Sequence, residues 1–266
     1  DKDFSVTLAE DGLLYNCFRN KCGLRGIMPV VRPKLDAEEL VKQVELRKKN
    51  NPNRKINPYK GKTWQLTSYE KNQLANIYQI PVAHVEIEDW MVDRSSTIRR
   101  VLMPIYAKNG MRIGMESKFV RDFSLSNIRD KNVEVTHKSL TYWDKPADEA
   151  YRIHFPRSNY NRPFINKKNG SEIYLVVEDI PSAVSVAPYV PTVALLGSGI
   201  SEANMDFFRG KTVIFCLDED ATIKAVNLVK KHYLMFAGYQ VIPILKDPKN
   251  MTQDEIAMDI VNKIRV

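Results

Sequence analysis

The sequence predicts an α/β protein that ends in a domain built on a four-stranded parallel sheet. Short apolar runs rich in β-branched residues recur at Ile173–Val177, Thr192–Leu196 and Thr212–Leu217. Each run is too short for an amphipathic helix and is followed by Glu, Gly or Asp, as expected of buried parallel strands. Helical patterns follow the later runs, so strands and helices alternate.

The elements before this domain are of mixed type. Residues 1–28 are expected to form a β-rich ribbon, followed by a linker at Pro29–Pro33. A helix is predicted from the cap at Asp36 to the Asn50–Asn53 cluster. A second helix is predicted to begin at Ser68 and to end before Pro81.

A β-hairpin is predicted in the middle of the chain. Its strands are Thr97–Tyr106 and Met111–Phe119, and Gly110 lies in the turn between them. A further strand at Ala150–Phe155 is expected to add to the same sheet, with His154 as a structural residue.

The last part of the chain completes the alternation of strands and helices. A short helix is predicted after Ser201, and a longer one over Ala221–Phe236 that Gly238 closes. The fourth strand is placed at Gln240–Leu245, and the last helix begins at Thr252.

Acidic residues stand where the predicted strands end. Because neighbouring parallel strands end at one crevice, Glu178 can approach Asp218 and Asp220. Residues two apart in a strand face the same side, so the two aspartates can share one hard cation such as Mg²⁺. Asp247, after the fourth strand, is a further candidate ligand, and Glu219 is expected to point away.

Four pieces of sequence occur in an order that resembles the TOPRIM fold of bacterial and phage primases, topoisomerases and some nucleases. They are Val177-Glu178, Ala194–Gly197, Leu217–Asp220 and Lys246-Asp247-Pro248. The resemblance implies that residues 169–266 form a TOPRIM domain. Two positions depart from many primases: Asp179 stands in place of a glycine, and Ser182 in place of a second acid.

The start of the chain resembles the second half of the zinc ribbon that precedes the polymerase core of such primases. The similar pieces are Tyr15–Phe18 and Cys22–Gly26, which implies Zn²⁺ bound by Cys17 and Cys22. A structural zinc takes four ligands, and the earlier Cys/His pair is missing, so the site is expected to be incomplete in this chain. The implied domains are residues 1–32 (partial ribbon and linker), 33–168 (basic α+β subdomain) and 169–266.

The predicted hairpin also resembles a strand pair of these primases that faces the TOPRIM crevice. By this resemblance Arg99, Arg100, Lys118 and Arg121 are candidates to bind triphosphate or template phosphate. Alternate residues of a strand face opposite sides, so not all four can serve, and Lys118 and Arg121 are favoured. Glycines in Gly197–Gly199 could cradle a phosphate, although tight strand-to-helix turns use the same residues.

Charge and composition agree with a nucleic-acid enzyme. The 266 residues have a formal net charge of +8. Residues 171–266 hold nine Lys and Arg against twelve Asp and Glu, a net −3, which leaves 31 against 20, or +11, for residues 1–170. A basic region attracts a phosphate backbone, although single lysines often only solvate a surface.

The number of cysteines and the hydropathy of the chain indicate where in the cell the protein is expected. Three cysteines do not make a disulfide scaffold, and Cys216, inside a strand, is expected in the core. No apolar stretch is long enough to span a membrane and no signal peptide opens the chain, so the sequence predicts a cytoplasmic protein, in a bacterial host if phage-encoded.

The resemblance implies a DNA primase that acts in DNA replication. Its reaction would be nucleotidyl transfer that depends on Mg²⁺ or Mn²⁺. Such an enzyme makes short RNA primers on single-stranded DNA from ribonucleoside triphosphates and works with a replicative helicase. Two alternatives stay open at this point. One is a TOPRIM nuclease or topoisomerase, and the other is a non-catalytic nucleic-acid-binding subunit.

Overall fold

The described part of the chain contains three β-sheets, two of them after residue 53. The computed structural model describes residues 56–128, 134–135, 138–145, 151–158, 164–197, 202–217 and 222–265, together with the backbone of three strands before residue 29. The chain divides into two compact units, residues 1–52 and 53–266. The expected boundaries at 32/33 and 168/169 stay predictions.

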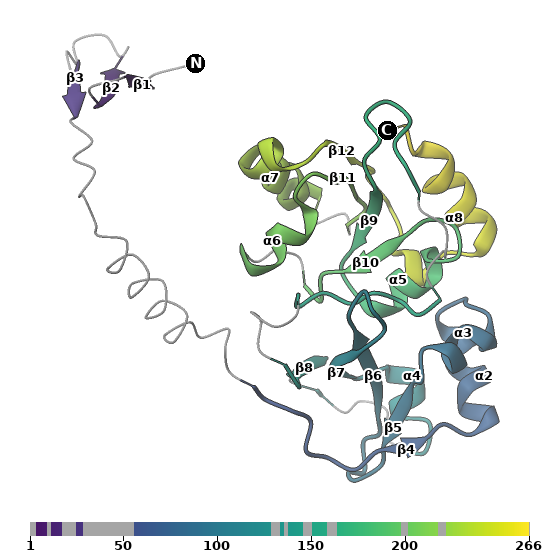
Figure 1. Cartoon of the computed structure of the whole chain (residues 1–266). Coiled ribbons are helices and arrows are strands. Elements are labelled where there is room, and N and C mark those ends of the chain that lie inside the picture. Colours follow the sequence, from purple (N-terminus) through teal and green to yellow (C-terminus); the bar gives the residue numbers. More distant parts are fainter. Residues whose placement is uncertain are drawn as a thin grey trace. The chain divides into compact units, whose positions relative to one another are not determined.

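The first unit contains three antiparallel strands in the order β1-β2-β3 (Figure 1). They are β1 (Phe4–Ala9), β2 (Gly12–Cys17) and β3 (Arg25–Met28). This agrees with the β-rich character expected for residues 1–28. The helix predicted between Asp36 and Asn53 lies outside the described residues.

The second unit contains the predicted four-stranded parallel sheet, with strand order β10-β9-β11-β12. Its strands are β9 (Ile173–Val177), β10 (Thr192–Ala194), β11 (Thr212–Phe215) and β12 (Gly238–Val241). All residues of β9, β10 and β11 are buried, which explains why these segments are apolar without alternation. The predicted α/β fold class is confirmed.

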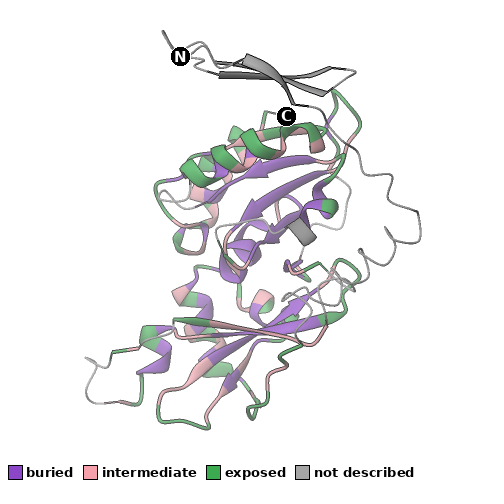
Figure 2. Cartoon of the chain, turned by 90° about the vertical axis from the view of Figure 1, so that its left-hand side faces the viewer, coloured by how far each residue is buried: buried purple, intermediate pink, exposed green. Residues whose placement is uncertain are grey.

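Helices cover both faces of this sheet (Figures 1 and 2). They are α5 (Ile180–Val186), α6 (Glu202–Phe208), α7 (Thr222–His232) and α8 (Gln253–Asp259). Val176 packs in one cluster with Phe208 of α6 and Val229 of α7, whereas its neighbour Leu175 packs in another with residues of α5 and α8. Figure 2 shows buried strands in the middle of this layered arrangement, and every residue of α5 is buried as well.

An antiparallel sheet of five strands precedes the parallel sheet, with strand order β4-β5-β6-β7-β8. The strands are β4 (Trp64–Gln65), β5 (Met91–Asp93), β6 (Arg100–Tyr106), β7 (Arg112–Lys118) and β8 (Ser139–Trp143). The predicted hairpin is confirmed as β6 and β7, which pair from Val101 opposite Lys118 onward. Gly110 closes the turn with φ +78°, a conformation that suits glycine.

Helices α2 (Ser68–Ile77), α3 (Val82–Ile87) and α4 (Arg121–Ser124) accompany the antiparallel sheet. The predicted start of α2 at Ser68 is confirmed, and its cause is local. Thr67 and Glu70 form a capping box, in which Thr67 Oγ1 accepts from Glu70 N and Glu70 Oε2 accepts from Thr67 N at 2.9 Å.

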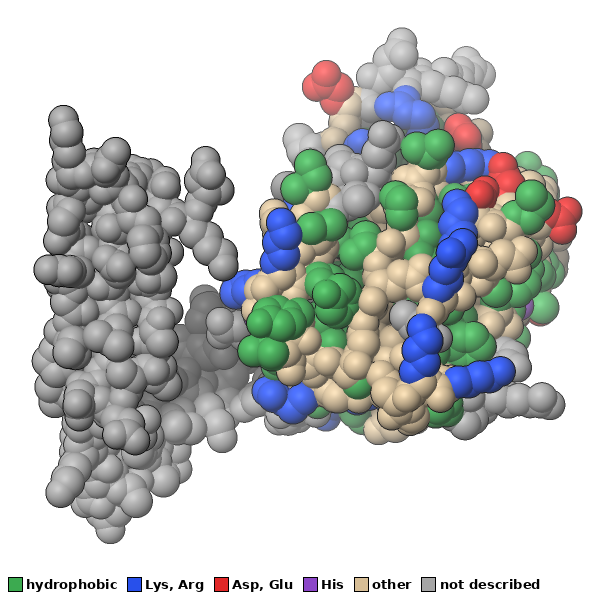
Figure 3. Space-filling view, turned by 90° about the horizontal axis from the view of Figure 1, so that it is seen from above, with side chains coloured by type: hydrophobic (Ala, Val, Ile, Leu, Met, Phe, Trp, Pro, Cys, Tyr) green, Lys and Arg blue, Asp and Glu red, His purple; other side chains and the backbone are tan. Residues whose placement is uncertain are grey.

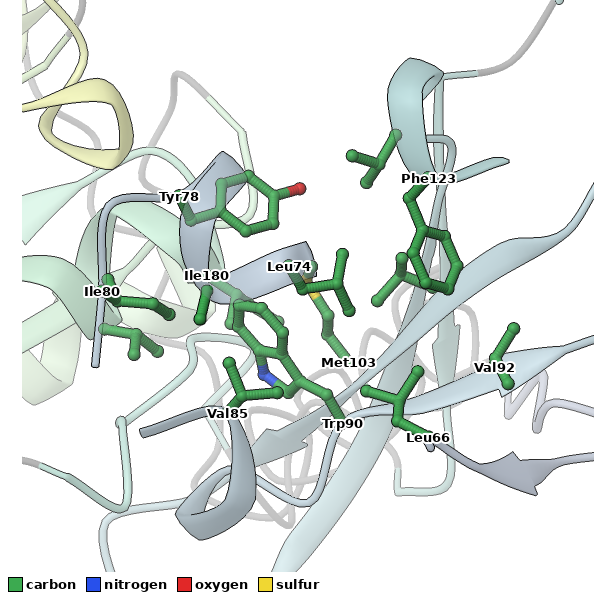
Figure 4. Packing of buried hydrophobic residues seen from close by; sticks show 14 of the residues in the cluster. Leu66, Leu74, Tyr78, Ile80, Val85, Trp90, Val92, Met103, Phe123 and Ile180 are labelled. Carbon is green, nitrogen blue, oxygen red and sulfur yellow. The ribbon is translucent and has the colours of Figure 1, made fainter. Parts of the chain in front are cut away.

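A shared hydrophobic core joins the two sheets. Figure 4 shows Ile180, the first residue of α5, beside side chains of the antiparallel part such as Trp90 and Val85. Ile180 is fully buried there, as is Val184 one turn later. The start of α5 is therefore anchored in the core of the preceding subdomain. This matters because α5 begins directly after Glu178 and Asp179.

Two element predictions are wrong. Residues 151–155 form no strand of the antiparallel sheet; instead His154 makes a single bridge to Ala194 of β10. Phe155 N donates to Tyr106 O at 2.9 Å, so the segment crosses from one sheet to the other. Pro156 follows and has no N–H to continue a ladder.

Gly238 begins strand β12 and does not close a helix. Helix α7 ends at His232, and a 3₁₀ turn, η3, covers Tyr233–Met235. A Cβ at Gly238 would lie 2.9 Å from Thr212 Oγ1 of the neighbouring strand, so only glycine fits here without displacement. The last helix begins as predicted, with Thr252 as the N-cap of α8.

None of the helices in the described part of the chain combines the length and hydropathy needed to cross a bilayer.

Candidate active site

The carboxyl ends of the parallel strands meet at one edge, which we call the acid edge and define by Glu178, Asp179 and Asp247. Glu178 directly follows β9 and is partly buried. Strand β11 runs beside β9, and Cys216 N donates to Val176 O at 2.9 Å. The chain that enters position 218 therefore lies beside the chain that enters Glu178. Asp218, Glu219 and Asp220 themselves lie outside the described residues, so their convergence stays a prediction.

The end of β10 joins the same edge. Gly197 N donates to the carbonyl oxygen of Glu178 at 3.2 Å. Of the proposed phosphate loop Gly197–Gly199 only the first residue is described, so this role stays a prediction as well. Strand topology thus brings the ends of three strands to Glu178.

Asp179 is fixed by its own helix. It is the N-cap of α5, and its Oδ1 accepts a hydrogen bond from Ser182 N at 3.0 Å. Ser182 stands where many of the resembled primases have a second acid. Here it donates its backbone N–H to Asp179. Together with the burial of Ile180, this cap holds the Asp179 carboxylate in one orientation.

Two lysines from different elements converge on Asp179. Lys118 Nζ, at the end of β7, lies 2.5 Å from Asp179 Oδ2. Lys249 Nζ lies 3.0 Å from the same oxygen and 2.6 Å from Asp247 Oδ2. The antiparallel sheet thus contacts the acid edge through Lys118, and Lys249 links the acid edge's two aspartates.

The ion pairs decide the protonation states of this cluster. Burial alone would raise the pKa of Asp179, but the ammonium groups of Lys118 and Lys249 hold that pKa well below its ordinary value. Burial likewise works to lower the pKa of Lys118, but the negative charges of Asp179 and Glu116 outweigh it, so that pKa is raised. Both side chains are therefore charged at neutral pH.

Asp247 directly precedes a short 3₁₀ turn, η4 (Pro248–Asn250), and follows β12, which ends at Val241 and not at Leu245 as expected. Its Oδ2 is bonded to Lys249, while its Oδ1 is buried and accepts no hydrogen bond from the described residues. Carboxylate oxygens are suitable ligands for Mg²⁺. Within the described ranges, however, no three His, Cys, Asp or Glu side chains gather closely enough to hold a metal ion. A fit to Mg²⁺ therefore depends on Glu178 together with Asp218 and Asp220.

The predicted phosphate-binding residues separate into two groups. Lys118 reaches the acid edge, with its side chain 15% exposed. Arg121 is the first residue of α4 and is exposed. Which phosphate either residue would meet stays a prediction.

Arg99 and Arg100 hold other parts of the antiparallel subdomain together. Arg99 Nη1 lies 2.7 Å from Glu70 Oε1, and its guanidinium stacks over the Phe123 ring at 4.7 Å. Arg100 donates to Ser117 Oγ and to Ser117 O, both at 2.9 Å. The two side chains leave the strand on opposite sides, as alternation requires, and these partners do not belong to the acid edge.

The segment of residues 151–155 brings a second ionisable pair between the sheets. His154 and Glu88 are fully buried, with Nε2 and Oε2 3.7 Å apart. His154 Nδ1 accepts from Tyr106 N at 3.3 Å, and Glu88 Oε1 accepts from Ser158 N at 2.9 Å. Burial lowers the pKa of His154 to about 3 and raises that of Glu88 to about 7, so both favour their neutral forms. The expectation of a structural histidine agrees with this burial.

The cysteines are described only in part. Cys216 is buried in the core of the parallel sheet, as predicted. Cys17 is the last residue of β2, opposite Phe4 in the register. Cys22 lies outside the described residues, so zinc binding stays a prediction.

Neither Lys249 nor Asp179 was among the predicted site residues. The signal for Lys249 was present in Asp247-Pro248-Lys249, because a proline after an aspartate favours a turn that folds the following residues back. In the structure Asn250 N donates to Asp247 O at 2.8 Å, which closes that turn.

Basic side chains are not confined to the acid edge. Figure 3 shows the molecule from above: Lys and Arg side chains lie among hydrophobic ones on this face, and Asp and Glu side chains lie toward its edges. This agrees with the formal net charge of +8.

Comparison with known proteins finds similarity at the level of solved structures. No family model and no curated protein matches the chain. The primase fragment of the bacteriophage T7 primase-helicase protein is 13% identical, covers 79% of this chain and 80% of its own, and has a TM-score of 0.49. A DnaG primase catalytic domain bound to single-stranded DNA is 17% identical, covers 70% and 68%, and has a TM-score of 0.48. The E. coli primase catalytic core is 14% identical, covers 71% and 70%, and has a TM-score of 0.47. At these identities and scores, function has to be argued from the chain's own residues.

Proposed function

We propose that this protein is a DNA primase that synthesises short RNA primers on single-stranded DNA by Mg²⁺-dependent nucleotidyl transfer. The observation that carries the proposal is the meeting of an acid edge with a basic strand. Glu178 ends a buried parallel strand, and Lys118, from a separate sheet, lies 2.5 Å from the adjacent Asp179. Transfer of a nucleotidyl group needs both a carboxylate-held cation and a positive group for the phosphates.

The acids are assigned by their place in the sheet. Glu178, Asp218 and Asp220 would hold Mg²⁺ or Mn²⁺, because they follow two neighbouring parallel strands. When bound, such an ion lowers the pKa of an attacking 3′-hydroxyl and neutralises the departing pyrophosphate. Glu178 would either bind this ion or accept the proton of that hydroxyl as a general base.

The basic residues would orient the phosphates. Lys118 and Arg121 are proposed to face triphosphate or template, since Lys118 is already beside the acids. The net +11 of residues 1–170 supports attraction of single-stranded DNA by release of its counterions. A replicative helicase as partner and Zn²⁺ at Cys17 and Cys22 are further parts of the proposal.

One assay separates primase from its rivals. The protein is incubated with Mg²⁺, labelled ribonucleoside triphosphates and single-stranded DNA. Oligoribonucleotides support the proposal, shortened DNA indicates a nuclease, and bound but unchanged DNA indicates a binding subunit. A topoisomerase would in addition change the linking number of circular duplex DNA.

A matched pair of variants tests the acids. Asp218→Asn is expected to reduce primer synthesis at least ~100-fold while DNA binding persists, because a metal ligand is lost but not the basic surface. Asp206→Asn makes the same change in α6 at a side chain that is 67% exposed, and it should leave synthesis unchanged. Normal synthesis by Asp218→Asn would contradict the assignment.

A further inference from the structure

One ammonium group lies between two carboxylates at the acid edge. Lys249 Nζ is 3.0 Å from Asp179 Oδ2 and 2.6 Å from Asp247 Oδ2. Lys118 adds a second ammonium on Asp179. Two negative charges thus face two positive charges, all contributed by the chain itself. A cation that two carboxylates share is the usual arrangement for a divalent metal ion.

The backbone holds this arrangement in place from both sides. Asp179 caps α5, whose first residue Ile180 is fully buried. Lys249 belongs to η4, which begins at the buried Pro248. Met251, directly after η4, lies in the core with 3% exposure. The three charged side chains are themselves only 17–22% exposed. Lys249 is therefore a built part of the acid edge and not a surface lysine that happens to reach it.

We propose that the ammonium of Lys249 takes the place of a divalent cation, so that Asp179 and Asp247 serve the chain's own lysine and not a metal ion. The inference rests on the proposed function, because it concerns the same carboxylate edge. Divalent ions needed for nucleotidyl transfer would then be held by Glu178, Asp218 and Asp220 alone. Asp247, which the sequence suggested as a further metal ligand, would then bind Lys249 and no metal ion.

Charge explains why lysine and metal exclude each other here. Asp247 Oδ1 is buried and accepts no hydrogen bond from the described residues. A divalent ion at Oδ1 would lie across one carboxylate group from the Lys249 ammonium, which repels it in a poorly solvated place. Ser182, whose backbone N–H caps Asp179, has a neutral side chain and therefore adds no negative charge that could offset the repulsion.

The test counts bound Mn²⁺ by electron paramagnetic resonance of the free ion, in the whole chain without nucleotide or DNA. Lys249→Met is expected to bind one more Mn²⁺ per chain than the wild type, because Asp179 and Asp247 lose their shared cation. Lys246→Met removes a lysine of the same charge that pairs with exposed Glu255, and its count should equal the wild-type count. Adding Asp247→Asn to Lys249→Met should abolish the gain.

A second variant decides the matter if Lys249→Met does not fold. Asp247→Asn in the wild-type background should leave the Mn²⁺ count unchanged, since that carboxylate already holds a lysine. Loss of one Mn²⁺ in Asp247→Asn, or an unchanged count in folded Lys249→Met, would overturn the inference. Neither readout needs primer synthesis, so failure of the proposed function would be seen separately in the primer assay.

Discussion

Two places between the sheets bury ionisable groups, but the groups are charged at one place and favour their neutral forms at the other. At the acid edge, Asp179 stays charged because Lys118 and Lys249 surround it. At the other place, Glu88 and His154 are fully buried and favour their neutral forms. Burial disfavours charge where it outweighs the interactions of a group, as at Glu88, whereas close opposite charges preserve it, as at Asp179. Only the acid edge therefore keeps charged side chains that can interact with phosphates and cations.

The pH behaviour of the two places differs accordingly. The pKa of Asp179 is lowered by its lysines, so its contribution to stability is present above the ordinary Asp range and is lost as the pH falls below it. Glu88 has a raised pKa, so its contribution is present below pH 4.5 and is lost as the pH rises through about 7. Single substitutions test this difference between the two places.

The largest effect is expected for Lys118→Met. It leaves Asp179 buried with one lysine in place of two, and breaking a buried ion pair costs about 3–5 kcal/mol of the free energy of unfolding. Urea denaturation at pH 7 measures it. Lys71→Met is the control, because its partner Glu86 is 52% exposed and the expected loss is below about 1 kcal/mol. Equal losses in the two variants would mean that the acid edge is not a buried pair.

A somewhat smaller loss is expected for Ile180→Ala, which tests whether the shared core positions the acid edge. Ile180 is fully buried among residues of the antiparallel subdomain (Figure 4), so the substitution should cost about 2–4 kcal/mol. Primer synthesis at a temperature where the variant remains folded should also fall. Ile165→Ala, at a side chain 42% exposed, should change neither quantity appreciably. Full synthesis by folded Ile180→Ala would show that the acid edge does not depend on this anchor.

The smallest effect concerns the neutral pair and appears as slopes against pH. Between pH 4.5 and 6.5 the folded chain keeps one proton on Glu88 and none on His154, whereas the unfolded chain has the reverse. The two proton counts are equal, so the pair gives the wild type little slope of stability with pH.

Replacing one member of the pair should make stability depend on pH through the other member. In Glu88→Gln only His154 titrates, and stability should rise with pH up to about 6.5. In His154→Asn only Glu88 titrates, and stability should fall as the pH rises toward about 7. Each slope is at most about 1.4 kcal/mol per pH unit. Urea unfolding at pH 5, 6 and 7 measures both, and slopes of the same sign would rule out the neutral pair.

Features that depend on neighbours along the chain could be predicted from the amino-acid sequence. Buried parallel strands are recognisable as short apolar runs, so β9, β10 and β11 were predicted, together with Glu178 after β9 and Asp218 after β11. The start of α2 and the turn at Gly110 have equally local causes, a capping box and a positive φ. Because parallel strands end at one edge, even the approach of β11 to Glu178 followed from the pattern.

The tertiary structure decided which charges meet. Lys118 and Arg99 look alike in the sequence as basic residues of one hairpin, yet Lys118 pairs with Asp179 and Arg99 with Glu70. Lys249 reaches Asp179 only because the turn after Asp247 folds back against α5. Such partners are set by how the sheets pack on their shared core, and a pattern along the chain carries no information about distances across that core.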